Sequence, residues 1–285
     1  MKRFLCTLLS LSVGAFAVDF SGDFKGPAGL QLYSLRESFK TDVPGTLDKV
    51  KALGIREVET ASTYGLGPEK FKAMLEERGL KPVSGHFQYE ALKKDTAAAV
   101  KEAQALGLKF AVCPWIPHEI GSFGEADVQR AAADFKTFGA AFKAAGIQVA
   151  YHPHGYEFRP VVEGGTETLF DRMVKTTDAN VVSFEMDVFW VVHPGQDPAK
   201  LLATYPDRWV LMHLKDIRKG ARTGVFTGKA PLTDDVPLGT GQVDWPTVLK
   251  AAAKAGVKHY FIEDESPTVA DALPVTLKYL QTVKF

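Results

Sequence analysis

Residues 46–59, TLDKVKALGIREVE, contain the structural unit from which most of this chain is built. Apolar side chains spaced about one helical turn apart, among charged ones, predict an amphipathic helix that ends before Gly54. Gly54 suits the left-handed C-cap of this helix, and the apolar Ile55 after it packs back on the helix. A strand is expected to begin near Glu57. The unit is therefore a helix, a glycine and a strand.

The same pattern recurs along the chain, with its glycine returning at Gly79, Gly107, Gly146 and Gly256. We expect strands beginning near Leu30, Glu57, Pro82, Phe110, Val149, Val181, Val210 and Tyr260. Helices are expected near 45–53, 67–78, 94–106, 127–145, 166–177, 198–204, 245–255 and 269–283. Alternating strands and helices imply a parallel sheet. Eight such units in roughly 250 residues are typical of a (β/α)8 TIM barrel, and a doubly wound sheet gives no reason for eight strands.

The composition is that of an ordinary globular protein. The chain has 285 residues, of which 46% are hydrophobic and 24% charged. Lys+Arg and Asp+Glu both number 34, so the formal net charge is zero. A protein that binds nucleic acid usually carries an excess of basic residues. We therefore expect no nucleic-acid partner. From the eight repeated units we expect one α/β domain over residues 18–285.

Residues 1–17 have the features of a signal peptide. Lys2 and Arg3 form a positive start, residues 4–15 are almost entirely apolar, and Ala15-Phe16-Ala17 fits the small-x-small cleavage rule. An uncleaved anchor is the alternative, but the apolar run is too short to span a bilayer comfortably. We expect cleavage before Val18, export to the periplasm or outside the cell, and no membrane span in the mature protein.

The stretch 149–158, VAYHPHGYEF, carries the first candidate functional residues. Pro153 ends the expected strand because proline cannot donate to a sheet ladder. His152 and His154 lie two residues apart and therefore on one face. Glu157 follows within reach of the same place. Two imidazoles and a carboxylate at a strand end predict a metal or proton-transfer site.

Three later strands end in similar residues, and function in a TIM barrel is located at these C-terminal ends. Asp187, His213 and Glu263 each interrupt an otherwise apolar strand. Burying one such group without a partner costs several kcal/mol, so several converging groups indicate a site. With a fourth ligand from the fifth strand, they form an oxygen and nitrogen set. That set suits one divalent ion, Mn, Mg, Co or Zn, in an open catalytic geometry.

Other residues at the strand ends are candidates for substrate binding. Aromatic side chains there are expected to wall a sugar ring, although plain packing is the alternative. The residues expected to bind substrate are Gln31, His86, Trp115, His154 and Trp190. Lys215 is expected to polarise a substrate oxygen or act as an acid, with a salt bridge as the alternative. Residues 214–245 form an unusually long connection, which predicts a lid over the site.

Several stretches together carry a resemblance to a known family. They are GLQLYSLR, TLDKVKALGIREVE, VAYHPHGYEF, FEMDVFWVVHPGQDP, LMHLKDIRKG, PLGTGQVDWPTVLKAA and YFIEDE. In these stretches the chain resembles the xylose isomerase-like TIM barrels of the AP endonuclease family 2 type, in their sugar phosphate isomerase/epimerase branch. The resemblance covers almost the whole chain after residue 17.

The resemblance implies metal ligands on the fifth to eighth strands, usually Glu, Asp, His and Glu. Asp187, His213 and Glu263 match the last three. At the fifth strand this chain has His152 where many members have Glu. We take Glu157 as the missing ligand, which leaves His152 as a base. In the alternative, His152 is the ligand and Glu157 binds substrate.

The activity implied is that of a divalent-metal-dependent isomerase or epimerase acting on a sugar or keto-sugar through an enediolate. Glu263 or His152 would remove a proton, and Lys215 would assist. The alternative is a dehydratase or lyase that performs β-elimination on a keto-sugar, 3-keto-glycoside or keto-inositol. A non-catalytic carbohydrate-binding barrel is a further alternative. The expected partner is a small sugar, and the sequence leaves a homo-oligomer open.

Overall fold

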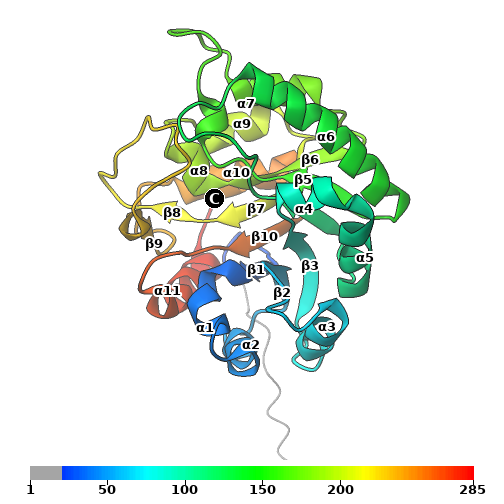
Figure 1. Cartoon of the computed structure of the whole chain (residues 1–285). Coiled ribbons are helices and arrows are strands. Elements are labelled where there is room, and N and C mark those ends of the chain that lie inside the picture. Colours follow the sequence, from blue (N-terminus) through cyan, green and yellow to red (C-terminus); the bar gives the residue numbers. More distant parts are fainter. Residues whose placement is uncertain (1–20) are drawn as a thin grey trace, which may run out of the picture.

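The computed structural model describes residues 21–285, and the predicted signal peptide lies outside this range. Eight parallel strands form a closed barrel in the order β1-β10-β7-β6-β5-β4-β3-β2 (Figure 1). They are β1 Ala28–Gln31, β2 Glu57–Thr60, β3 Lys81–His86, β4 Phe110–Cys113, β5 Gln148–Tyr151, β6 Val182–Asp187, β7 Trp209–Leu214 and β10 His259–Ile262. The predicted (β/α)8 TIM barrel is confirmed.

Helices surround the barrel on the outside (Figure 1). They are α2 Val43–Ala52, α3 Pro68–Glu76, α4 Tyr89–Lys94, α5 Thr96–Leu106, α6 Glu125–Ala144, α7 Leu169–Thr176, α9 Pro198–Thr204, α10 Trp245–Ala255 and α11 Val269–Thr282. The helix expected over 94–106 is α5, and the short α4 before it was not predicted; Asp95 ends α4 and caps α5 by accepting from Ala98 N. Within residues 21–285, none of the helices is long and apolar enough to cross a membrane.

The repeated glycine has the C-cap role that its position predicted. Gly107 follows α5 with a φ of 76°. The backbone N–H of Leu108 then donates to the carbonyl of Ala103 at 3.0 Å, the bond that closes a Schellman cap. Leu80 and Val257 make the same bond after Gly79 and Gly256. Each cap turns the chain back toward the next barrel strand.

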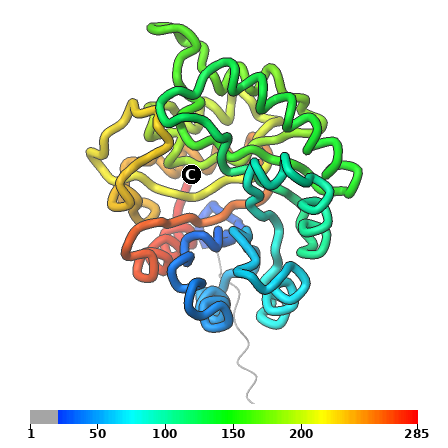
Figure 2. The backbone as a smooth tube through the Cα atoms, viewed as in Figure 1, coloured from blue at the N-terminus to red at the C-terminus, as the bar shows by residue number. Residues whose placement is uncertain are grey.

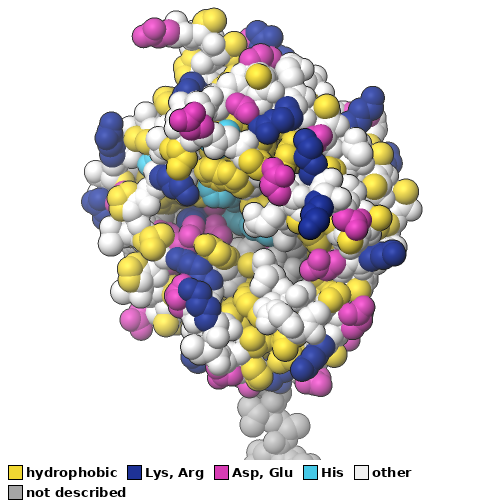
Figure 3. All heavy atoms as spheres, in the orientation of Figure 1, with side chains coloured by type: hydrophobic (Ala, Val, Ile, Leu, Met, Phe, Trp, Pro, Cys, Tyr) yellow, Lys and Arg dark blue, Asp and Glu magenta, His cyan; other side chains and the backbone are white. Residues whose placement is uncertain are grey.

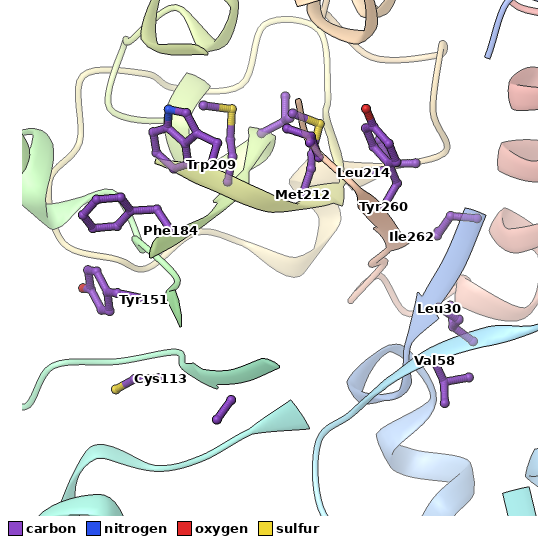
Figure 4. Close-up of a cluster of buried hydrophobic side chains, with 14 of the residues drawn as sticks. Leu30, Val58, Cys113, Tyr151, Phe184, Trp209, Met212, Leu214, Tyr260 and Ile262 are labelled. Carbon is purple, nitrogen blue, oxygen red and sulfur yellow. The ribbon is translucent and has the colours of Figure 1, made fainter. Parts of the chain in front are cut away.

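The strands bury side chains on both faces. The outward side chains pack beneath the helices, and Figure 4 shows Leu30, Phe184 and Met212 among them. A second apolar cluster consists of Val83, Phe110, Val112, Ala150, Leu211 and Phe261. Because strand residues alternate between faces, Leu211 and His213 point to the side opposite Met212. The inward positions therefore change from apolar to polar toward the C-terminal ends of the strands.

Short elements follow several strands at this end. They are η1 Leu32–Leu35, α1 Arg36–Phe39, η2 Tyr156–Phe158, α8 Val188–Val192, β8 Asp216–Ile217, η3 Leu232–Asp234 and β9 Asp235–Val236. β8 pairs antiparallel with β9 and closes the base of residues 218–234, which we call the lid segment. Arg218 strengthens this base because its Nε donates to Asp234 Oδ1 at 3.0 Å. In Figure 2 the lid segment lies within the yellow-to-orange excursion at the left of the barrel.

Candidate metal and substrate site

Four side chains from neighbouring strands meet at the C-terminal end of the barrel: His152, Asp187, His213 and Glu263, which we call the donor group. His213 Nδ1 is 3.2 Å from His152 Nε2, 3.4 Å from Asp187 Oδ2 and 3.3 Å from Glu263 Oε2. His152 Nε2 lies 3.4 Å from Asp187 Oδ2. All four residues are buried. The structure thus brings together the three ligands predicted from strands six to eight, with His152 as the fourth member.

The spacing of the donor group fits a bound divalent ion. Metal–ligand distances of about 2.0–2.2 Å place the atoms of a tetrahedral set about 3.3–3.6 Å apart. The observed separations of 3.2–3.4 Å approach that range. Asp187 Oδ2 is also buried without a hydrogen-bond partner among the described residues, although such atoms are nearly always paired. Two carboxylates and two imidazoles would neutralise and ligate one divalent cation.

Glu157 lies outside the donor group. Both of its carboxylate oxygens accept from His154 N at 3.1 Å, and Tyr151 Oη donates to Oε1. Burial raises the pKa of Glu157 to about 7. Gly155, at a φ of 95°, turns the chain away before η2. Glu157 therefore stabilises the turn after β5 through these hydrogen bonds and is not placed as the expected metal ligand. His152 lies at the strand-five position of the donor group instead.

A pair of variants separates these two residues. His152→Gln is expected to lower divalent-metal affinity by more than the roughly 10–100-fold typical of a supporting residue, because a ligand is lost. Glu157→Gln should leave metal content unchanged while lowering the thermal midpoint, because it disturbs the bond to Tyr151. Elemental analysis after dialysis checks both. The opposite pattern, with metal lost only from Glu157→Gln, would make Glu157 the ligand.

A second group lies beside His213, at its other ring nitrogen. It comprises Glu59, His86 and Glu185, and we call it the inner group. Glu59 Oε1 is 2.7 Å from His213 Nε2 and 3.0 Å from His86 Nε2. Glu185 Oε2 lies 3.3 Å from His213 Nε2 and 3.5 Å from His86 Nε2. Two buried carboxylates therefore face the same two imidazoles.

A cavity of about 350 Å³ opens beside the donor group. Its lining includes His86, Trp115, His152, His154, Trp190 and Glu263. Figure 3 shows this hollow, with histidine side chains in cyan at its floor and acidic side chains beside them. Of the residues predicted to bind substrate, Gln31 alone does not line the cavity. Its amide donates to Glu59 Oε1 at 2.6 Å instead.

Lys215, predicted to be catalytic, is held by carboxylates. Its Nζ is 3.1 Å from Glu263 Oε2, 2.6 Å from Glu265 Oε1 and 3.8 Å from Asp235 Oδ2. Burial opposes the charge, but these carboxylates raise the pKa of Lys215 well above its ordinary value. The side chain is therefore a fixed cation that orients Glu263.

Two cavity-lining imidazoles outside the donor group have opposite surroundings. His154 packs against Trp115 and Trp190, and burial together with His152 holds its pKa well below the usual value. His86 is only slightly exposed, and the loss of solvent opposes its charge, yet Glu59 and Glu185 raise its pKa to about 9. Since His86 Nε2 faces both carboxylates, Nδ1 is the ring nitrogen left for a substrate. Pairs of groups with pKa values pushed apart are typical of acid–base sites.

The lid segment contributes to the cavity lining through Gly228, Lys229, Ala230 and Leu232. Gly228 has a φ of 66°, and a Cβ there would lie 2.8 Å from the Trp115 ring. Glycine therefore allows the close approach of the lid to this wall. Lys229 Nζ lies 5.2 Å from the centroid of the Trp115 ring. These contacts bring the long segment to the cavity, and its action as a lid stays a prediction.

Deletion of residues 221–232 is expected to lower kcat/KM by roughly 100-fold, the scale on which lost substrate positioning acts. The barrel should still fold, because the deletion leaves β8, β9 and the Arg218–Asp234 contact in place. Circular dichroism and the thermal midpoint check folding, and steady-state kinetics check turnover. Unchanged kinetics in a folded deletion variant would remove the lid segment from function.

Glu59 and Glu185 were recognisable at the strand ends but received no role from the sequence. The signal was present, since Glu185 shares a face with Asp187 two residues later on β6. The sequence did not show which of the two carboxylates on β6, Glu185 or Asp187, lies at the level of the donor group. Register in the closed barrel decides that, and β6 carries an irregularity between Phe184 and Glu185.

The chain is similar in sequence and in fold to several known proteins. An inosose dehydratase from Clostridium botulinum is 24% identical over 276 residues, covering 84% of this chain and 87% of that protein. A sugar phosphate isomerase/epimerase structure from Parabacteroides distasonis is 25% identical with a TM-score of 0.75, covering 90% of this chain and 93% of that one. A zinc-containing IolI protein shares the fold at 14% identity and a TM-score of 0.69, covering 89% and 96% of the two chains. The family model for xylose isomerase-like TIM barrels matches residues 47–282, and the chain therefore belongs to that family.

Proposed function

We propose that this protein is a metal-dependent dehydratase that removes water from a cyclic keto-polyol such as an inosose. The observation that carries the proposal is a complete four-residue donor group opening on a cavity that also contains two imidazoles outside the group. The similarity to inosose dehydratases over most of both chains supports a dehydratase over the isomerase or epimerase favoured from the sequence.

His152, Asp187, His213 and Glu263 would hold the divalent ion. Such an ion polarises a carbonyl oxygen and makes the adjacent C–H bond more acidic. Zn, Mn, Co and Mg all remain candidates for this oxygen and nitrogen donor set. The cavity-lining residues then have to bind the ring, remove the proton and assist the departing hydroxyl.

His86 is the proposed base in its neutral form, which a pKa of about 9 makes the minor form at neutral pH, so turnover should rise as the pH approaches 9. Glu59 accepts from its Nε2, an arrangement that orients the ring and strengthens Nδ1 as a proton acceptor. The electron pair of the broken C–H bond forms the carbon–carbon double bond, and the neighbouring C–O bond breaks. The departing oxygen takes the proton from His86 and leaves as water. No oxidant or reductant is needed, and the base is regenerated.

His154 is proposed to donate to the substrate. If His152 binds the ion through Nε2, its Nδ1 carries a hydrogen that points at His154 Nδ1, 3.1 Å away. His154 then carries its own hydrogen on Nε2, as a neutral donor. The rings of Trp115 and Trp190 flank His154 and offer apolar surfaces for the C–H faces of a cyclic substrate.

An isomerase or epimerase remains the second candidate. The similarity to a sugar phosphate isomerase/epimerase structure at 25% identity supports it. The same proton removal would begin either reaction, and return of the proton to carbon rather than loss of hydroxyl would give an isomer. A non-catalytic carbohydrate-binding barrel is disfavoured because it has no need of the donor group. We also propose, from residues 1–17, that the protein is exported.

The test uses the full mature protein, stripped with a chelator and reloaded separately with Zn, Mn, Co or Mg. Inosose is then added and the loss of water is followed by mass spectrometry. Turnover restored by at least one metal and absent from the stripped protein supports the proposal. Equal turnover with and without metal contradicts it, and metal-dependent formation of a product of unchanged mass favours the isomerase.

A further inference from the structure

The two ring nitrogens of His213 face different groups. Nδ1 faces the donor group, at 3.2–3.4 Å from its other three members. Nε2 lies 2.7 Å from Glu59 Oε1, a hydrogen-bond distance. A carboxylate accepts, so Nε2 carries the hydrogen. The lone pair of Nδ1 is then the one directed at the metal position.

Glu59 is itself held from several sides. Ser84 Oγ donates to its Oε2, and the Gln31 amide donates to its Oε1 at 2.6 Å. Gln31 is oriented in turn because its own Oε1 accepts from Tyr33 N at 3.0 Å. Glu59 and Ser84 have no exposed surface. The carboxylate therefore has little freedom to leave His213.

Glu59 and the two imidazoles that it contacts are better described as a hydrogen-bonded support than as ligands of a second metal ion. The contacts of 2.7 Å and 3.0 Å between Glu59 and the imidazoles are shorter than the roughly 3.3 Å edge expected around a tetrahedral ion. Glu185 lies slightly farther away, and both of its oxygens lack a hydrogen-bond partner among the described residues. Its charge nevertheless acts on the same imidazole nitrogen, 3.3 Å away.

We propose that Glu59 is the positioning residue that fixes the tautomer and orientation of the metal ligand His213, with Gln31 and Ser84 as braces. Glu185 adds negative charge behind the same ring. This inference rests on the donor group holding the metal, but not on the identity of the substrate. It assigns Gln31, predicted to bind substrate, to the support of a ligand instead.

The chain offers a closely matched control on the same strand. Glu57, at the opposite end of β2, has Oε2 2.7 Å from His259 Nδ1. Glu57→Gln and Glu59→Gln therefore each change a carboxylate paired with a histidine at the same distance. The histidine paired with Glu57 is not a member of the donor group, whereas His213, which is paired with Glu59, is a member.

The experiment measures metal affinity by competition with a chromogenic chelator and the visible absorption of the Co²⁺-loaded protein. Glu59→Gln is expected to weaken metal binding roughly 10–100-fold, as loss of an outer hydrogen-bonding partner typically does. Its Co²⁺ bands should shift, because the imidazole donor changes. Glu57→Gln should retain both affinity and spectrum. Ser84→Ala, which keeps the carboxylate but removes a brace, should give a smaller change in the same direction.

Two failures are distinguishable. If the wild-type protein binds no divalent metal, the donor group itself is refuted. If the wild type binds metal and folded Glu59→Gln has wild-type affinity and an unchanged Co²⁺ spectrum, only the positioning role is refuted. Should Glu59→Gln not fold, the same readouts on Ser84→Ala decide, since unchanged affinity and spectrum there would overturn the role.

Discussion

Asp187→Asn is expected to lower divalent-metal affinity by at least about 100-fold, exceeding the range for loss of an outer partner. Asp187 Oδ2 faces His152 and His213, and its negative charge is part of what a cation would neutralise. Asparagine keeps an oxygen that can accept from Trp190 N, the bond that caps α8. The variant should therefore fold while losing metal and turnover together.

The control is Asp197→Asn, which changes a helix-capping aspartate away from the donor group. Asp197 Oδ1 accepts from Lys200 N at 3.1 Å at the start of α9. Elemental analysis and chelator competition should show wild-type metal binding in this control. Wild-type affinity in folded Asp187→Asn would instead remove Asp187 from the donor group and with it the predicted metal geometry.

His86→Gln is expected to lower kcat by roughly 10²–10⁴-fold, the usual contribution of a general acid–base group. Metal content should be retained, because His86 contacts Glu59 and Glu185 and lies outside the donor group. Exchange of the substrate hydrogen beside the carbonyl, measured by NMR in heavy water, should fall together with product formation.

His118→Gln serves as the comparison for this variant. His118 stacks on Trp115 at 5.0 Å but does not line the cavity, so its replacement should leave exchange nearly unchanged. If folded His86→Gln exchanges the hydrogen at the wild-type rate, His86 is not the base. Glu263, which also lines the cavity and was predicted from the sequence to remove the proton, would then take that role.

The strand ends were the most informative part of the sequence. Asp187, His213 and Glu263 could be predicted to meet because parallel barrel strands bring their C-terminal ends to one rim. The 3.3–3.4 Å contacts of His213 with the two carboxylates bear this out. The helix ends could be predicted from the sequence equally well, since Asp197 and Gly107 occupy cap positions that follow from local backbone chemistry.

The choice between His152 and Glu157 depended on a turn that local patterns do not determine. Pro153 and Gly155 showed that the chain turns, but not in which direction the turn carries Glu157. Tyr151 decides the outcome, because its hydroxyl, on the outward face of β5, bonds to Glu157. The inner group was missed for a related reason, since the depth of Glu59 and Glu185 depends on how the strands stagger on closure.

The central claim is that a metal held by the donor group serves a reaction that removes water. The most direct measurement is the mass and deuterium content of the product formed from inosose by metal-loaded wild-type protein in heavy water. The account predicts a product lighter by one water molecule, formed only when metal is present. A product with the composition of the starting compound, carrying deuterium on carbon, would instead show an isomerase or epimerase and contradict the proposed elimination.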